Sequence, residues 1–139
     1  MQEYGLSFIN KNRHRPSNNN PGEGVSIVFN PNKLPLKEFS FKRSRYELVG
    51  ASGRLTNNTR PIFILGAYMS TKLKADQYHD LLDHLSDAIM RIKTENTSPY
   101  IILGGDFNRK DIYEAIGDYS DLEKVMPPWT SVQPTLMLK

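Results

Sequence analysis

Residues 62–68 read IFILGAY, residues 100–107 read YIILGGDF, and Lys74–Glu95 lies between them. Each apolar run has the composition of a strand that is buried on both faces. The segment between them carries seven apolar residues at helical spacing: Tyr78, Leu81, Leu82, Leu85, Ala88, Ile89 and Ile92. The order strand, helix, strand predicts a crossover unit whose two strands lie parallel in one sheet.

Shorter strands are predicted upstream of this unit. Val25–Asn30 (VSIVFN) alternates branched and polar residues and stops before Pro31. Phe39–Phe41 and Tyr46–Val49 have the composition of two further strands, and the glycine and asparagines of Gly50–Pro61 predict a hairpin connection. The polar segment Lys11–Gly24 is predicted to be a loop.

Weaker patterns follow the unit. A short helix is expected at about Asp111–Ile116, and from Met126 onward the prolines indicate a loop without a further strand.

Size and composition limit the possible classes of protein. A chain of 139 residues predicts one domain, over residues 1–139. Cysteine is absent, which excludes a disulfide framework, a thiolate zinc site and a cysteine nucleophile, and favours an intracellular setting. No stretch approaches the ~20 apolar residues that span a bilayer, and Met1–Asn10 lacks the apolar region of a secretion signal, so we expect no membrane association.

Charge is divided between the two halves of the chain. Residues 1–60 carry ten Lys/Arg and four Asp/Glu, whereas residues 61–139 carry eight and eleven. This division suits a rim that binds a polyanion beside a carboxylate-bearing centre. Two clusters carry the basic excess, and they are candidate nucleic-acid contacts: Lys11, Arg13 and Arg15 in the first, and Lys42, Arg43 and Arg45 in the second. Ordinary solvated loops are the alternative interpretation.

The strongest candidate for chemistry is the run of residues 104–108 (GGDFN), where a buried strand leads into two glycines and a carboxylate. If the chain stays extended, Asp106 and Asn108 point the same way, because side chains alternate along a strand. A carboxylate and an amide that converge at a strand end can orient a water and hold a phosphate oxygen or a metal. The alternative is a turn in which both side chains bond to their own backbone.

Other polar and aromatic residues give weaker signals. His79 and His84 lie five apart on the predicted helix, so they are expected to be surface residues rather than paired metal ligands. His14 lies in the first basic cluster, where phosphate contact is the functional interpretation. Trp129 either stacks on a base or anchors the last segment to the core.

Together these segments resemble a known superfamily. Ile102–Asn108 (ILGGDFN) resembles the GDFN signature of the endonuclease/exonuclease/phosphatase superfamily, and the strand ending in Ala67-Tyr68 resembles its strand with an active-site tyrosine. Gly24–Phe29 is similar to the GGVAI strand of that superfamily, and Tyr46–Val49 occupies the place of the next strand. The most similar pattern is that of the endonuclease domain of non-LTR retrotransposons, which precedes a reverse transcriptase.

The resemblance implies an α/β fold, a four-layer α/β sandwich of the DNase I-like type. It implies Mg²⁺-dependent hydrolysis of a phosphodiester in DNA or RNA by an activated water. On that basis Asp106 orients or deprotonates the water, Asn108 contacts the scissile phosphate or the metal sphere, and Tyr68 hydrogen-bonds to the phosphate. A reverse transcriptase in a longer polyprotein would be a partner, and the site of action would be the nucleus.

Departures from the pattern predict a domain that is incomplete at both ends. The upstream strands that carry an asparagine and a metal-binding glutamate are not recognisable, and Glu3 has no apolar strand to support it. The late Asp-His pair is also missing, Leu136 stands where an arginine often follows the Pro-Thr turn, and Ser70 replaces a proline. No metal ligand is therefore assigned. The rival hypotheses are an inactive fragment that at most binds nucleic acid, and a phosphatase for a small phosphoester.

Overall fold

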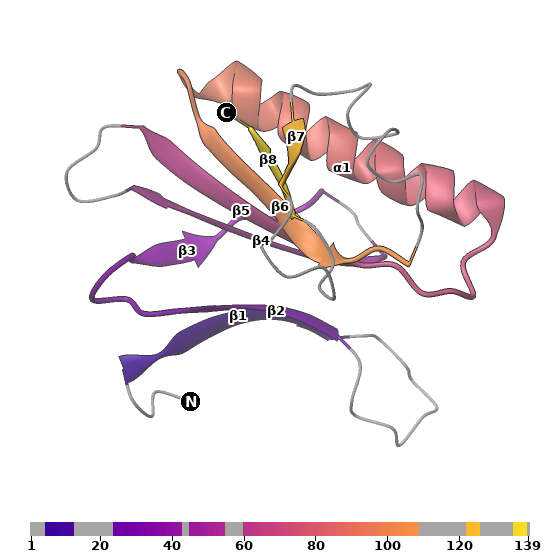
Figure 1. The fold of residues 1–139 in the computed structure, drawn as a ribbon, viewed down its shortest axis with the longest axis horizontal. Coiled ribbons are helices and arrows are strands. Elements are labelled where there is room, and N and C mark those ends of the chain that lie inside the picture. Colours follow the sequence, from indigo (N-terminus) through magenta and orange to yellow (C-terminus); the bar gives the residue numbers. More distant parts are fainter. Residues whose placement is uncertain are drawn as a thin grey trace.

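The computed structural model describes residues 5–12, 24–42, 45–54, 60–108, 122–125 and 135–138. Within these ranges lie eight strands and one helix (Figure 1). Their bounds are β1 Ser7–Asn12, β2 Gly24–Phe29, β3 Leu36–Glu38, β4 Glu47–Arg54, β5 Pro61–Tyr68, α1 Ala75–Glu95, β6 Tyr100–Asp106, β7 Leu122–Val125 and β8 Thr135–Leu138. The strands form a two-stranded ribbon, β1-β2, and a six-stranded sheet in the order β3-β4-β5-β6-β8-β7.

The predicted crossover unit is confirmed. β5 and β6 pair in parallel from Ile62↔Tyr100 to Tyr68↔Asp106, and α1 connects them. The buried residues of α1 are the seven predicted from its spacing. Gln77 fixes the start of the helix, because its side-chain oxygen accepts a hydrogen bond from the Lys74 N–H at 3.0 Å.

The main core fills the space between α1 and one face of the six-stranded sheet. Alternate residues of β5 and β6 point to this face, among them Leu65, Ala67, Ile101 and Leu103, and all four are completely buried. Leu81 and Leu85 of α1 pack against them. This face of the sheet therefore provides most of the hydrophobic stabilisation.

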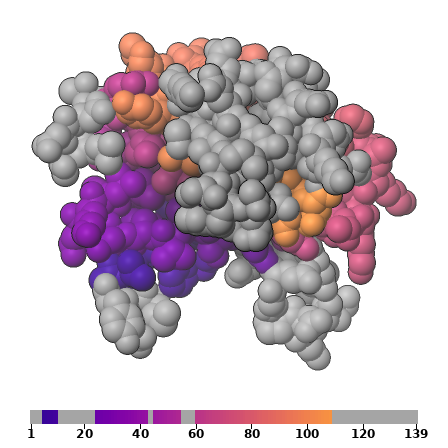
Figure 2. Space-filling model, viewed as in Figure 1, coloured from indigo at the N-terminus to yellow at the C-terminus, as the bar shows by residue number. Residues whose placement is uncertain are grey.

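The ribbon β1-β2 covers part of the opposite face, which we call the inner face. Ile27 of β2 is buried with Val49 and Ala51 of β4, and Ile9 and Ile64 pack against them. Helix, six-stranded sheet and ribbon form three successive layers of a sandwich (Figure 1). The outer side of the ribbon reaches the surface, where the indigo and purple residues are visible (Figure 2).

Two predictions about the middle strands need correction. The strand expected at Phe39–Phe41 lies at Leu36–Glu38 instead. Phe39 is drawn toward the helix side, where its ring contacts Phe41 and Phe63 edge to face at centroid distances of 5.8 and 5.7 Å. The strand expected at Tyr46–Val49 runs from Glu47 to Arg54, because its antiparallel ladder with β5 continues to Arg54↔Pro61. The hairpin connection is correspondingly shorter than predicted.

Three strands were not predicted. β1 occupies Ser7–Asn12, so the predicted loop is wrong for Lys11 and Asn12, and β7 and β8 lie where no strand was expected. Each depends on partners distant in sequence: Ser7 pairs with Phe29, and Leu136 pairs with Leu103. Such pairing leaves little signal in a short segment, because its stability comes from the neighbouring strand.

Several predictions fall outside the described residues. These are the helix at Asp111–Ile116, and the roles of Glu3, His14 and Trp129. Within the part of the chain that the structure describes, α1 is not apolar enough to span a membrane.

Candidate active site at the ends of β5 and β6

Tyr68 and Asp106 are direct neighbours at the end of the parallel pair β5-β6. Register partners on adjacent strands point to the same face of a sheet. Ala67 lies in the core beneath α1, so Tyr68, the next residue, points to the inner face, and Asp106 does likewise. Tyr68 is half-buried and Asp106 is exposed. The crossover topology thus brings together two residues that are far apart in sequence.

Asn108 joins the same edge by a turn rather than by an extended strand. Its φ is +50°, in the left-handed region that asparagine tolerates. Its Nδ2 donates a hydrogen bond to the Met69 carbonyl oxygen at 2.7 Å, and the Met69 N–H donates to the Asp106 carbonyl oxygen at 2.8 Å. Asn108 therefore bonds to the end of β5 and not to its own backbone, and its Oδ1 remains an acceptor.

Two residues between these polar groups fix the turn. Gly105 has a φ of +139°, and a Cβ there would lie within 2.9 Å of the Ala67 carbonyl carbon and closer still to its oxygen. Only glycine fits this conformation without strain. Phe107 is completely buried in the core beneath α1. The GGDFN run is thus shaped by packing on one side and presents polar groups on the other.

Glu47 is a candidate that the sequence analysis missed. It is the register partner of Tyr68 on β4, so Glu47, Tyr68 and Asp106 form a row across three adjacent strands of the inner face. The Oε2 atom of Glu47 is buried. The sequence did contain a signal for Glu47: it lies between Tyr46 and Leu48, which point to the core beneath α1, so its own side chain points to the inner face.

The described members of the second basic cluster lie near α1. Arg45 Nη2 is 3.2 Å from the Tyr46 hydroxyl and 3.7 Å from Asp80 Oδ2, and Tyr46 donates to the same Asp80 oxygen at 2.7 Å. The hydrogen bond with Tyr46 raises the pKa of the Arg45 guanidinium, and burial raises the pKa of the Tyr46 hydroxyl, so Tyr46 stays a donor. Lys42 is exposed and lines a hollow beside α1 with His84.

These positions separate Lys42 and Arg45 from Asp106, which points to the inner face. Arg13, Arg15 and Arg43 lie outside the described residues, and of Lys11 only the backbone is described, in β1. Their predicted contact with nucleic acid stays a prediction.

His79 and His84 lie on α1 and do not approach the row on the inner face. His79 is exposed, as expected, whereas His84 is partly buried against the Tyr46 ring at a centroid distance of 5.7 Å. Among the described residues, no group of three or more His, Asp or Glu side chains lies close enough to hold a metal ion.

Solved structures similar to this chain share its fold. The human Nocturnin catalytic domain, solved with a bound sulfate anion, matches 97% of this chain and 61% of its own, with a TM-score of 0.59 and 17% identity. TDP2 from Caenorhabditis elegans matches 88% of this chain and 36% of its own, with a TM-score of 0.63 and 17% identity. A humanized TDP2 from D. rerio matches 96% of this chain and 58% of its own, with a TM-score of 0.56 and 11% identity. No family model and no curated protein sequence matches the chain.

These likenesses establish the fold. The chain has the DNase I-like α/β sandwich of the endonuclease/exonuclease/phosphatase type, in incomplete form. It spans less than two thirds of each of these solved chains.

Proposed function

We propose that this chain is part of a metal-dependent phosphodiesterase that hydrolyses nucleic acid. The observation that carries the proposal is the adjacency of Tyr68 and Asp106 at the ends of β5 and β6, with Asn108 bonded to the end of β5. A phenol, a carboxylate and an amide at one exposed edge are the groups that position a water and a phosphate. The similarity of the fold to that of Nocturnin and TDP2 supports the same class of enzyme.

Each residue has a distinct role in this proposal. Asp106 accepts a proton from the attacking water, whose oxygen forms the new bond to phosphorus. The bond from phosphorus to the leaving oxygen breaks, and that oxygen takes a proton from solvent. Tyr68 donates a hydrogen bond to a non-bridging phosphate oxygen, and Asn108 Oδ1 accepts one from the water.

The donor atoms fit a hard cation. Asp106 and Asn108 are exposed and offer oxygen, which Mg²⁺ prefers, and Mg²⁺ uses one or two protein carboxylates together with waters and substrate phosphates. Bound there, Mg²⁺ would supply positive charge to the phosphate. Asp106 and Asn108 are the described residues that would hold it.

Glu47 supports Tyr68 rather than the metal in this scheme. Its place beside Tyr68 in the register of β4 on β5 suits a carboxylate that orients the phenol. If the two act as a unit, Glu47→Gln and Tyr68→Phe together slow cleavage by no more than the worse single substitution.

The finer features of the proposal come from the sequence resemblance. We propose residues 1–139 as one partial domain of the retrotransposon endonuclease type, encoded with a reverse transcriptase and acting on DNA in the nucleus. Backbone phosphates are bound by the two basic clusters: Lys11, Arg13 and Arg15, and Lys42, Arg43 and Arg45.

The decisive test is Mg²⁺-dependent nicking of supercoiled plasmid by the purified chain. Asp106→Ala is expected to lower the rate by about 10²-fold or more, the range for loss of a general base. EDTA is expected to abolish nicking, because it removes the cation that would bind the phosphate. Asp83→Ala is the matched control, because Asp83 is an exposed carboxylate on α1. Circular dichroism of each variant establishes that it is folded.

Other outcomes would favour the rival functions. Plasmid binding without nicking by the folded chain would identify an inactive nucleic-acid-binding fragment. Turnover of a small phosphodiester, without any response to DNA or RNA, would identify the phosphoesterase alternative. Equal nicking by wild type and Asp106→Ala would refute the proposed role of Asp106.

A further inference from the structure

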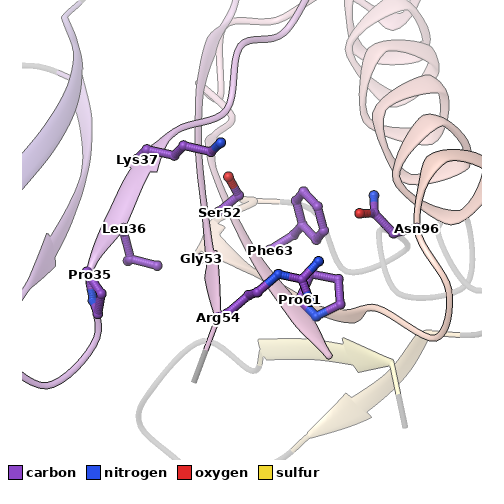
Figure 3. A pocket seen from close by; sticks show the side chains of 9 residues that line it. All are labelled: Pro35, Leu36, Lys37, Ser52, Gly53, Arg54, Pro61, Phe63 and Asn96. Atoms are coloured by element: carbon purple, nitrogen blue, oxygen red, sulfur yellow. The ribbon is translucent and has the colours of Figure 1, made fainter. Parts of the chain in front are cut away.

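A concave site lies at the end of β4 and the start of β5, away from the candidate active site. Its volume is about 420 Å³, and nine of the described residues line it: Pro35, Leu36, Lys37, Ser52, Gly53, Arg54, Pro61, Phe63 and Asn96 (Figure 3). It is distant from the candidate active site, because Arg54 and Glu47 are the two ends of β4, about 23 Å apart at ~3.3 Å per residue.

The pocket is formed by register and by the end of α1. Lys37, Ser52 and Phe63 are partners in a row across β3, β4 and β5, on the face that α1 covers elsewhere. The helix ends at Glu95, so Asn96 borders this uncovered part of the sheet. Gly53 is essential to the shape, because a Cβ there would lie 2.5 Å from the Pro35 carbonyl oxygen.

The polar lining favours an anion. Lys37 and Arg54 are exposed cations from two strands, Ser52 adds a hydroxyl, and the nine lining residues include no carboxylate. Two cations and a hydroxyl around one concavity match the charge and the acceptor oxygens of a phosphate. Asn96 uses its Nδ2 to bond the Ile92 carbonyl oxygen at 2.9 Å, so its Oδ1 faces a ligand as an acceptor.

The rest of the lining favours more than a bare anion. Phe63 and Pro61 provide an apolar wall between the cations and Asn96 (Figure 3). Pockets of a few hundred Å³ with such walls hold small organic ligands, whereas inorganic phosphate would leave the apolar wall exposed to solvent. A phosphate joined to a flat, mostly apolar ring with a hydrogen-bond donor would match the cations, the apolar wall and the Asn96 acceptor.

We propose that this pocket binds a phosphate-bearing nucleotide, with the phosphate between Lys37 and Arg54 and the base against Phe63. The nucleotide is either free or the 5′-phosphorylated end of a strand, since both present the same groups. The inference does not depend on the proposed phosphodiesterase activity, because none of the row Glu47, Tyr68 and Asp106 lines this pocket.

Isothermal titration of the full chain with AMP tests the proposal. Lys37→Glu and Arg54→Glu are each expected to weaken AMP binding by about tenfold or more, the scale of a lost charge-assisted hydrogen bond. Lys33→Glu is the matched control with the same charge change, because Lys33 is exposed on the preceding turn and does not line the pocket. Adenosine and inorganic phosphate are expected to bind more weakly than AMP.

Four results would overturn the proposal: no AMP binding at millimolar concentration, equal binding of AMP and phosphate, an equal loss with Lys33→Glu, or a loss with Asn108→Ala. The last result would assign AMP to the candidate active site. A 5′-phosphorylated oligonucleotide distinguishes the source of the ligand. If it competes with AMP, and Lys37→Glu abolishes that competition, the ligand is a strand end. If it does not compete with AMP, the ligand is a free nucleotide.

Discussion

Replacement of Gly105 by alanine is expected to destabilise the fold more than any other small change at the candidate site. The backbone conformation at φ +139° is one that residues with a Cβ rarely adopt, and holding alanine there costs about 1–3 kcal/mol. The added methyl would also collide with the Ala67 carbonyl group, and such overpacking costs about 1–3 kcal/mol. Together these effects lower the free energy of unfolding by about 3 kcal/mol.

Thermal unfolding followed by circular dichroism measures this change. For a chain of this size each kcal/mol lowers Tm by about 2–4 °C, so Gly105→Ala should lower it by about 10 °C. Gly5→Ala is the control, because Gly5 has a φ of +72° but open space around its Cβ position. It carries backbone strain alone, worth about 1 kcal/mol.

A Gly105→Ala variant with a Tm within a degree or two of the wild type would refute this account. The close approach of β6 to Ala67 would then not be required for the fold. A variant that loses stability only as much as Gly5→Ala would show that strain matters and the collision does not.

Three further predictions use other contacts. Leu85→Ala should lower the free energy of unfolding by about 3 kcal/mol in urea titration, because Leu85 is completely buried, and a loss below about 1 kcal/mol would contradict the core described above. Asn108→Ala should lower the free energy of unfolding by about 1–2 kcal/mol, and Asn108→Gly should lower it less, because glycine accepts the φ of +50° more easily than alanine. Equal losses in the two variants would mean that only the lost hydrogen bond to Met69 matters. Burial, and then the hydrogen bond to Asp80, raise the pKa of Tyr46, so its contribution to stability is present below its ordinary pKa of about 10 and is lost as pH rises through the folded-state pKa. Unfolding midpoints measured against pH should therefore fall in alkali and fall less in Tyr46→Phe, and parallel curves would contradict this assignment.

The sequence was sufficient for the parts of the fold whose signal is local. The seven buried positions of α1 followed from a period near 3.6, and the parallel pairing of β5 and β6 followed from the crossover helix between them. The adjacency of Tyr68 and Asp106 then follows, because parallel strands end at the same edge.

What the sequence did not reveal depends on partners distant in the chain. β1 and β8 are short, and each gains its hydrogen bonds from a strand that local pattern does not identify. Glu47 was missed for the same reason: its place beside Tyr68 comes from the register of β4 on β5. The sequence left open whether Asn108 extends the strand or lies in a turn, and the contact with Met69, which is distant in the chain, favours the turn.

The alternation of side chains at the end of β6 also decides which substitutions can test the chemistry. Phe107 is completely buried beneath α1, whereas its neighbours Asp106 and Asn108 are exposed. Phe107→Ala removes a core ring at a cost of about 3–5 kcal/mol, so a loss of activity there would report unfolding. Asp106→Ala removes an exposed carboxylate with little cost in stability, since Asp106 itself has no positive φ and exposed substitutions usually change stability by about 0.5 kcal/mol or less. A folded Asp106→Ala variant that cleaves nothing therefore identifies chemistry, and Phe107→Ala cannot.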